Sequence, residues 1–482
     1  MEQEIVLPSY DSLPYSDQAM GRRENRMASI ISGEARQDLL RLAKDWCAQY
    51  GQAGNLAEAE SLAEEARQTV GEAILETSLL GVSGKATYAG TRLPCACGGW
   101  LRFVSYRGRW VKSWCGEVRV ERAYYHCSAC KSGQAPWDRA QGLNERIWSP
   151  RFKAMVCGAM GRLPYAEGCC MLLELCGLSL QESSAEAILR EVGPRIRAEE
   201  AQRTVQMQAE LEQAMAKRLM VEVTSEPALP PLSVRGVEGK RLYASVDATT
   251  AHLDGDWHNV QAGMVFTVES DVEGRDRLLQ REYLSGRMNM ETLGWRMRTL
   301  AYRWQGPSYG EVVFLGDGAP CNWNLAATHF PDALCILDFY HASEHVWELS
   351  RALYRQEDAV QKALGDRWVR SRLDSLKKEG PKPLLRALKR RTGKTKPQQE
   401  AIRKALGYFT TNGKRMDYPA HLKAGRMIGS GPIEAACKVV VGQRLKQAGM
   451  RWTDTGADAV LAVRTTLLNG NSQRLTELAR AA

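Results

Sequence analysis

The chain has 482 residues, of which 44% are hydrophobic and 25% are charged. This length exceeds one ordinary core, so two to four domains are expected in a globular protein. The formal net charge of +9 permits a nucleic-acid partner without requiring one. No run of about 18 apolar residues is present and the N-terminus lacks an apolar leader core, so we expect no membrane-spanning helix, no signal peptide and a cytoplasmic protein.

Four regions are expected in the N-terminal half. Residues 1–90 are helical in pattern, with apolar residues at three- and four-residue spacing in segments rich in Ala, Leu and Glu. Residues 91–140 are β-rich and punctuated by glycine, and residues 141–221 return to a helical pattern. A proline-rich break at 222–239 is typical of a linker.

Two close cysteine pairs lie in the β-rich region: Cys95 with Cys97, and Cys127 with Cys130. Four thiolates in two knuckles are the ligand set of a closed tetrahedral zinc site, so we predict structural Zn²⁺ in a zinc-ribbon-like domain. The first pair is tighter than the usual knuckle, and core cysteines without metal remain the alternative. Basic and aromatic residues alternate around the pairs, which favours nucleic acid, although a solvated strand face shows the same alternation.

The helical region at 141–221 has the spacing of a helix-turn-helix. One helix ends at a turn around Gly177, and a second is expected to begin at Ser183 or Ser184. In such a motif the second helix enters a DNA groove. Any antiparallel helix pair has a similar pattern, and Glu182 makes the start of the second helix acidic, so a plain helical hairpin stays open.

A different periodicity begins at residue 240. We expect three consecutive strands, a helix, two buried strands and a long helical stretch rich in Lys and Arg, covering 241–247, 259–270, 275–286, 290–304, 311–317, 332–338 and about 341–423. Two further helices follow, the first of which carries Glu434.

Three carboxylates stand out in this half. Asp247 and Asp317 each end an apolar strand, and Glu434 lies on a late helix. A lone acid at a strand end is commonly a turn residue or helix cap, and Glu434 could simply pair with Lys438 on a solvated face. The order of the three is nevertheless that of an RNase H-like sheet, where two strand ends and a flanking helix converge. Such acids would hold two Mg²⁺ or Mn²⁺ ions, which serve in-line phosphoryl displacement.

Four segments together resemble a known family. They are "VRVERAYYHCSAC", "SVDAT", "FLGDGAPCNWNLAATHFPDALCILDFYHASEHVWEL" with its GDGA and LDFYHASEH signatures, and "IGSGPIEAACKVVVGQRLKQAGMRW" with GSGPIE. From about residue 90 onward the chain closely resembles the DDE transposases of bacterial insertion sequences of the ISKra type. The resemblance departs from the family pattern at Ala248, where a Gly is expected, and at the tight first knuckle.

The resemblance implies a multidomain α/β protein with an RNase H-like catalytic domain. That domain would be formed by 240–340 and 426–482, with a helical insertion at 341–425. Its metal-binding triad would be Asp247, Asp317 and Glu434.

The same resemblance implies a DNA transposase. The N-terminal half would bind the terminal inverted repeats of the insertion sequence, and the catalytic half would hydrolyse a phosphodiester at the element end and transfer the 3′-OH into target DNA. Both ends would be held in one complex, so a homodimer or higher oligomer is expected. Two alternatives stay open: a DNA-bound regulator derived from a transposase, and a nuclease for branched DNA that cannot join strands.

Side chains near the triad are expected to assist it. Ser430 is the expected N-cap of the Glu434 helix. We expect Asp338, His341 and His345 to form hydrogen bonds around the active site or to flanking DNA. A His/Asp metal site and plain helix capping are the less favoured alternatives. Four cations after Glu434 are expected to hold the DNA strand: Lys438, Arg444, Lys446 and Arg451.

Overall fold

The computed structural model is an α/β structure with two separate sheets. It describes residues 33–51, 53–80, 88–143, 147–219, 229, 231–233, 241–270, 276–305 and 309–480. The chain divides into two compact units, one formed by the described part of Met1–Thr87 with Cys115–Glu121, and the other by Tyr88–Trp114 with Arg122–Ala482. Most of the predicted linker lies outside the described residues. Within them, no helix has the length and apolar character needed to cross a bilayer.

The first unit contains the two helices predicted for the N-terminal region, α2 (Gly33–Tyr50) and α3 (Leu56–Leu80). Helix α2 buries none of its residues, and α3 buries only Leu80. The unit is completed by the tip of a β-hairpin, where the backbone N–H of Glu117 donates to the Glu72 carboxylate at 3.2 Å.

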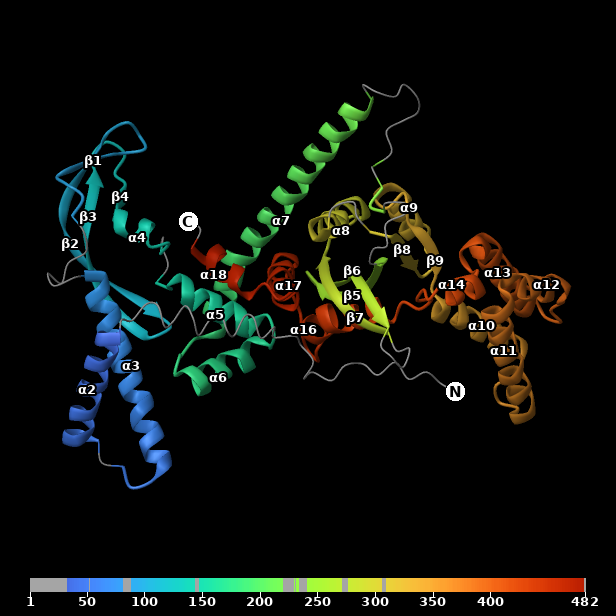
Figure 1. Cartoon of the computed structure of the whole chain (residues 1–482), viewed down its shortest axis with the longest axis horizontal. Helices are drawn as coiled ribbons and strands as arrows, with labels where there is room; N and C mark the ends of the chain where they lie inside the picture. The colour runs from blue at the N-terminus through green and yellow to red at the C-terminus, as the bar shows by residue number, and fades with distance from the viewer. Residues whose placement is uncertain are drawn as a thin grey trace. The chain divides into compact units, whose positions relative to one another are not determined.

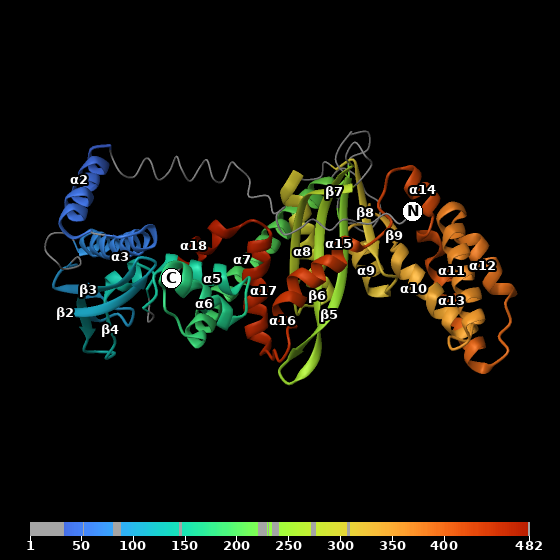
Figure 2. The same ribbon diagram turned by 90° about the horizontal axis from the view of Figure 1, so that it is seen from below.

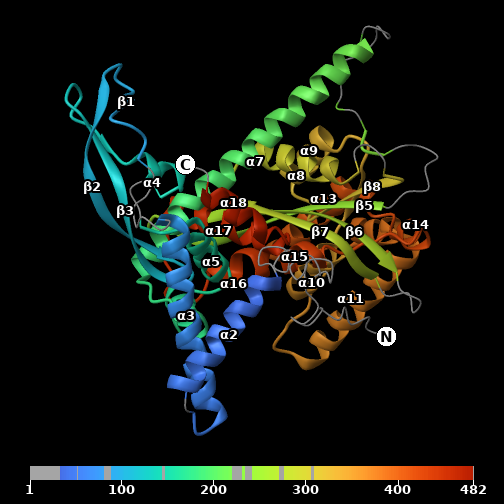
Figure 3. The same cartoon turned by 60° about the vertical axis from the view of Figure 1, so that its left-hand side comes forward.

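The β-rich region forms a four-stranded sheet in the order β1-β2-β3-β4. Figure 3 shows β1, β2 and β3 of this sheet. The strands are β1 (Arg92–Pro94), β2 (Trp100–Ser113), β3 (Gly116–Cys127) and β4 (Gly133–Gln134), followed by the short helix α4 (Pro136–Ala140). Leu101, Ala123, Tyr125 and Cys127 form a small buried apolar cluster in this sheet, beside the cysteine pairs.

Three helices follow: α5 (Pro150–Met160), α6 (Tyr165–Cys176) and α7 (Glu182–Leu219). Gly177 ends α6 in the left-handed conformation, with φ of 66°, as a helix C-terminus favours. Helix α7 begins one residue before the predicted start and runs for 38 residues. It packs along α17 (Asp454–Leu468), where a Cβ on Gly193 would lie 2.5 Å from the Ala459 Cα. The predicted turn is therefore present, but much of the second helix belongs to a packed interface.

The larger sheet has five strands in the order β7-β6-β5-β8-β9 (Figures 1 and 2). They are β5 (Arg241–Leu253), β6 (Asp256–Ser270), β7 (Asp276–Gly286), β8 (Glu311–Gly316) and β9 (Leu334–Leu337). The first three are antiparallel neighbours, whereas β8 runs parallel to β5, and β9 parallel to β8. All the predicted strands are present. Helix α8 (Met290–Gln305) packs on β6, and α9 (Pro320–His329) packs on α8 and β8.

The predicted helical stretch after β9 consists of five helices. They are α10 (Phe339–Leu353), α11 (Ala359–Glu379), α12 (Pro381–Arg390), α13 (Lys396–Asn412) and α14 (Tyr418–Lys423). Aspartates begin three of them, since Asp338, Asp358 and Asp417 accept backbone N–H groups at the starts of α10, α11 and α14.

The Glu434 helix is interrupted by a π-helical turn. It consists of α15 (Gly431–Ala436), the π-turn η3 (Cys437–Gly442) and α16 (Gln443–Leu445). Ile433, Ala436, Val440 and Val441 are buried at helical spacing, and this apolar stripe packs α15 and η3 against β5 and β6 (Figure 2). Helices α17 and α18 (Ser472–Arg480) close the chain.

Candidate functional site

The two cysteine pairs come together in one cluster. All four Sγ atoms lie within 4.8 Å of one another, with Cys95 and Cys130 at 3.6 Å and Cys97 and Cys127 at 3.7 Å. Four sulfurs about 2.3 Å from a tetrahedral zinc would be separated by about 3.8 Å, so the spacing fits a closed zinc site. The Ser132 hydroxyl, 3.0 Å from the Cys130 Sγ, lowers the pKa of that thiol to about 6 and favours the thiolate that a metal needs.

Backbone turns explain how the tight first knuckle works. The Gly98 N–H donates to the Cys95 carbonyl at 3.0 Å, and Gly98 has a φ of 83°, which a side chain would disfavour. The Cys95 N–H donates to the Gly99 carbonyl at 2.9 Å. The chain therefore reverses directly after Cys97, and one intervening residue is enough to aim both thiols at the same point.

Two of the arginines around this cluster have a structural partner. Arg122 Nε donates to Asp138 at 2.9 Å, and Arg109 Nη1 donates to the same carboxylate at 2.5 Å. All three side chains are largely buried. Aromatic side chains on the same ribbon are more open, since Trp100 and Trp110 are 57% and 55% exposed. Some residues of the alternating basic and aromatic pattern therefore form buried ion pairs, and others are exposed to solvent.

Asp247 lies on β5, and Asp317 is the first residue after the neighbouring parallel strand β8. Ser245 of β5 is paired with Leu315 of β8, and the two aspartates each come two residues later. Because side chains alternate along a strand, Asp247 lies on the same face of the sheet as Ser245. Strand β8 ends here as predicted, but β5 continues to Leu253, so Asp247 is inside its strand and not at its end. Both side chains are partly accessible.

Asp317 is held by its own loop and by the helical insertion. Its Oδ1 accepts the Ala319 N–H and the Asn322 side-chain amide, both at 2.8 Å. The Tyr408 hydroxyl of α13 donates to the Asp317 carbonyl at 3.0 Å. Gly318 has a φ of 101°, which allows the turn between β8 and α9. Sequence reasoning missed Asn322 and Tyr408. Asn322 follows Asp317 closely in the chain, but no pattern marks Tyr408, which lies 91 residues away.

Glu434 is exposed on α15, which packs on the strand that carries Asp247. Ser430 occupies the N-cap position of α15 as predicted, but its hydroxyl donates to the Glu434 carboxylate at 2.9 Å and does not cap the helix. Burial raises the pKa of the Cys437 thiol on the same helix, the Asp247 carboxylate raises it further, Lys446 lowers it, and Glu434 adds a smaller increase.

Asp338 joins the Glu434 loop to α10. It is fully buried, caps α10 by accepting the N–H groups of Tyr340 and His341, and also accepts the Ser430 N–H at 2.8 Å. Its own N–H donates to the Gly316 carbonyl at 2.8 Å. Asp338 thus links the end of β8, the start of α10 and the residue that holds Glu434.

The two histidines of α10 lie beside this region. His341 Nδ1 is 3.2 Å from the Glu344 carboxylate, and His345 Nδ1 is 3.3 Å from Glu348. The His345 ring lies against Tyr408, with centroids 3.8 Å apart, and so contacts the residue that holds the Asp317 carbonyl.

The three predicted catalytic carboxylates do not form a ready ligand cluster. Among the described residues, the cysteine cluster is the one group of three or more His, Cys, Asp or Glu side chains whose ligand atoms all lie within 4.8 Å. Asp247, Asp317 and Glu434 are placed around the same end of the sheet, with their oxygens further apart.

The four predicted DNA-binding cations divide into two classes. Lys438, Lys446 and Arg451 are exposed, and Lys446 Nζ donates to the Thr249 hydroxyl at 2.9 Å, two residues from Asp247.

Arg444 is different, and its predicted place on a DNA-binding surface is wrong. Its side chain is fully buried, its Nε donates to the Met160 carbonyl at 2.7 Å, and its guanidinium lies 5.0 Å and 4.8 Å from the ring centroids of Tyr165 and Trp452, which contact each other. Burial lowers its pKa to about 10. Because the apolar stripe of the Glu434 helix packs into the core, Arg444 is buried with it, and the rings of Tyr165 and Trp452 stabilise its charge.

Comparison with protein-family models gave no match for this chain, and comparison with curated proteins gave none either. The interpretation of the site therefore depends on its own residues and geometry.

Proposed function

We propose that this protein is a DNA transposase whose catalytic acids are Asp247, Asp317 and Glu434. One observation carries the proposal: Asp247 on β5 and Asp317, directly after the adjacent parallel strand β8, each lie two residues beyond the Ser245–Leu315 pair, and the Glu434 helix packs against β5. The strand order β7-β6-β5-β8-β9, with three antiparallel strands followed by two parallel ones, supports the assignment because an RNase H-like sheet is expected to have it.

The proposed metal ions are Mg²⁺ or Mn²⁺, and the donors suit them. Three carboxylates supply hard oxygen ligands, as these ions prefer. When bound, such ions lower the pKa of water and stabilise charge on phosphoryl oxygens. Asn322 and Ser430 would hold two of the carboxylates in position, since each already donates a hydrogen bond to one of them.

The proposed reaction has two balanced steps. Water first attacks the phosphorus at the element end, a new P–O bond forms, and the bond to the 3′ oxygen breaks to leave a 3′-OH. That hydroxyl then attacks a phosphodiester of the target DNA, and the target's own 3′ oxygen leaves. Neither step needs a protein nucleophile. Lys446, exposed beside Asp247, would contact the DNA backbone during both steps.

The N-terminal half would supply recognition of the element's terminal inverted repeats. The exposed Trp100 and Trp110 on the zinc ribbon, together with its open basic residues, support a nucleic-acid contact there. A dimer or larger assembly would hold two ends together.

The test is cleavage and joining of labelled DNA that carries the element's own end, with Mg²⁺ and with EDTA. Asp247→Ala, Asp317→Ala and Glu434→Ala should each lower the cleavage rate at least about 1,000-fold while DNA binding survives, because the variants lose charge stabilisation in the transition state. The control is Asp256→Ala, an exposed acid at the tip of the same hairpin as Asp247.

Three results would decide against this function. Normal cleavage by Glu434→Ala would remove the triad and leave Glu434 as a surface acid beside Lys438. Binding of the end by the wild type without any metal-dependent cleavage would favour a DNA-bound regulator. A preference for branched DNA over the element end, without strand joining, would favour a junction nuclease.

A further inference from the structure

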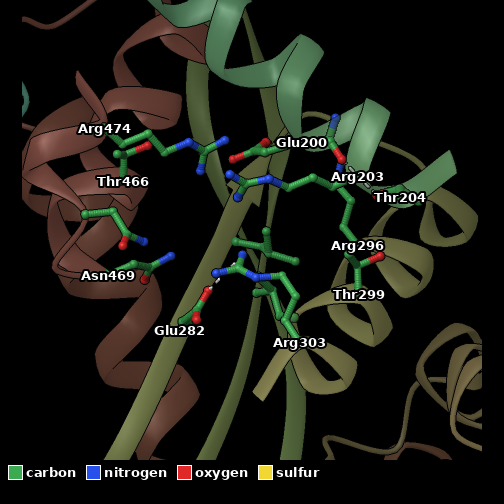
Figure 4. A pocket seen from close by; sticks show the side chains of 13 residues that line it. Glu200, Arg203, Thr204, Glu282, Arg296, Thr299, Arg303, Thr466, Asn469 and Arg474 are labelled. Atoms are coloured by element: carbon green, nitrogen blue, oxygen red, sulfur yellow. Dashed lines mark hydrogen bonds and ion pairs between the residues drawn. The ribbon is translucent and has the colours of Figure 1, made fainter. Parts of the chain in front are cut away.

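An arginine-rich pocket lies at the edge of the larger sheet, away from the carboxylates. Its walls come from α7, β7, α8 and the α17–α18 region. Figure 4 shows Arg474 and Arg303 entering it from opposite sides. Arg203 and Arg296 complete the four cations of the lining, which contains two carboxylates, those of Glu200 and Glu282.

These carboxylates are already engaged. Glu200 accepts from Arg197 Nη1 at 3.0 Å and pairs with Arg296 at 3.4 Å. Glu282 accepts the Trp304 indole N–H at 2.6 Å, and its distance to Arg303 Nη1 is 3.9 Å. Arg303 therefore has only a weak ion pair with this acid, and 40% of its side chain is exposed.

Two further cations share one acid. Arg203 and Arg474 both contact the Glu199 carboxylate, Arg474 through Nε at 2.8 Å. Burial lowers the pKa of Arg203, and the positive charges of Arg474 and Arg303 lower it further, against the opposing effect of Glu199. An added anion would relieve this repulsion.

The pocket continues into a second hollow along α7 and α8. The two share Arg203, Thr299 and Arg303, and the second extends to Tyr302, Gln206 and Glu210, whose carboxylate accepts the Gln206 amide at 3.2 Å. Two adjoining hollows that share the same arginines suit an elongated polyanion better than they suit a single small ion. Arginine is well suited to such a ligand because its planar guanidinium matches phosphate geometry.

We propose that this pocket binds a phosphate group of the DNA backbone, as a contact site separate from the carboxylates. The phosphate-binding chemistry stands on the pocket alone, and only the choice of DNA as its source rests on the proposed function. The contact would be independent of base sequence, because phosphates carry no sequence information.

The experiment uses the full chain and a labelled duplex of arbitrary sequence, titrated at several KCl concentrations. Arg303→Gln should weaken binding several-fold and reduce the slope of log Kd against log[KCl] by about 1, as expected for one lost phosphate contact. Arg303→Lys retains the charge and should keep most of the slope. Arg277→Gln is the matched control, since Arg277 is exposed on the same strand β7 and outside the pocket.

A parallel titration with inorganic phosphate, read by thermal stability, distinguishes the two phosphate sources. Loss of stabilisation by phosphate in Arg303→Gln with unchanged duplex binding would overturn DNA as the source. Unchanged behaviour in both titrations would overturn the pocket as a phosphate site. Because neither titration requires cleavage, failure of the proposed transposase activity would leave both results interpretable.

Discussion

The cysteine cluster and the carboxylate site are both candidate metal sites, and they are built differently. The four thiols come from one small sheet and already lie within 4.8 Å of one another. The three acids come from β5, the loop after β8, and α15, and they lie further apart. The cysteine site is closed and local, whereas the carboxylate site is open and assembled from distant parts of the chain.

This difference follows from charge and from task. The thiols of the cysteine cluster lie at hydrogen-bonding distance from one another, and a structural zinc site needs its ligands to surround one ion completely. Carboxylates are ionised at neutral pH and repel each other, so without a cation they are better held apart. An open arrangement also leaves room for substrate oxygens, which a catalytic ion requires. Substitutions that disturb each site should therefore have different consequences.

The largest effect is expected at the cysteine cluster. Cys127→Ser removes a buried thiol from the small core of the four-stranded sheet, and metal binding supplies much of the folding free energy of such domains. We expect the variant to lose about one bound zinc per chain and the fold of this sheet. Elemental analysis and near-UV circular dichroism measure the two losses.

The exposed Cys47 on α2 provides the control, because Cys47→Ser should keep both the zinc and the fold. Treatment of the wild type with 1,10-phenanthroline, whose nitrogen donors favour zinc over Mg²⁺, should reproduce the effect of Cys127→Ser. If Cys127→Ser retains a full equivalent of zinc, the four-cysteine assignment is incorrect.

A smaller effect is expected at Asp338, which supports the carboxylate site without belonging to it. Asp338→Ala would leave three backbone N–H groups without their acceptor in a buried place, those of Tyr340, His341 and Ser430. We expect a loss of about 3 kcal/mol in the free energy of unfolding, measured by urea titration.

Asp358 is the matched control, since it caps α11 through two N–H groups at a more open position. Asp358→Ala should cost about 1 kcal/mol, the usual value for an N-cap. Equal losses in the two variants would show that the link from Asp338 to Ser430 contributes nothing beyond ordinary capping.

The two sites also differ in how far sequence predicts them. The cysteine ligands lie in short local motifs, so spacing alone was enough to bring them together. For the larger sheet, strand patterns predicted every element, and Asp317 was correctly placed at a strand end. The continuation of β5 past Asp247 was not predicted, because its polar residues beyond Asp247 pair only with β6 and need no apolar pattern.

Side chains whose role depends on tertiary packing were the least predictable. Arg444 has the local context of a DNA-binding cation, yet it is buried against Trp452 and against Tyr165, which is far away in the chain. Tyr408 supports Asp317 from within the helical insertion. In both cases the partner is far away in the chain, and no spacing rule reaches that far.

The smallest effect is expected at Asn322, the donor that fixes the orientation of Asp317. Asn322→Leu keeps the volume of the buried side chain but removes the 2.8 Å hydrogen bond to Oδ1. The carboxylate would then rotate more freely, and the Mg²⁺ concentration for half-maximal cleavage should rise about 10-fold, the lower end of what outer-shell partners contribute.

Asn324→Leu, at an exposed position on the same helix, is the control and should leave this concentration unchanged. A fall in maximal rate at saturating Mg²⁺, with no change in the half-maximal concentration, would mean that Asn322 does not orient a metal ligand. The open site would then depend on the backbone of the loop after β8 to place Asp317, in the way that the knuckle turns place the cysteines.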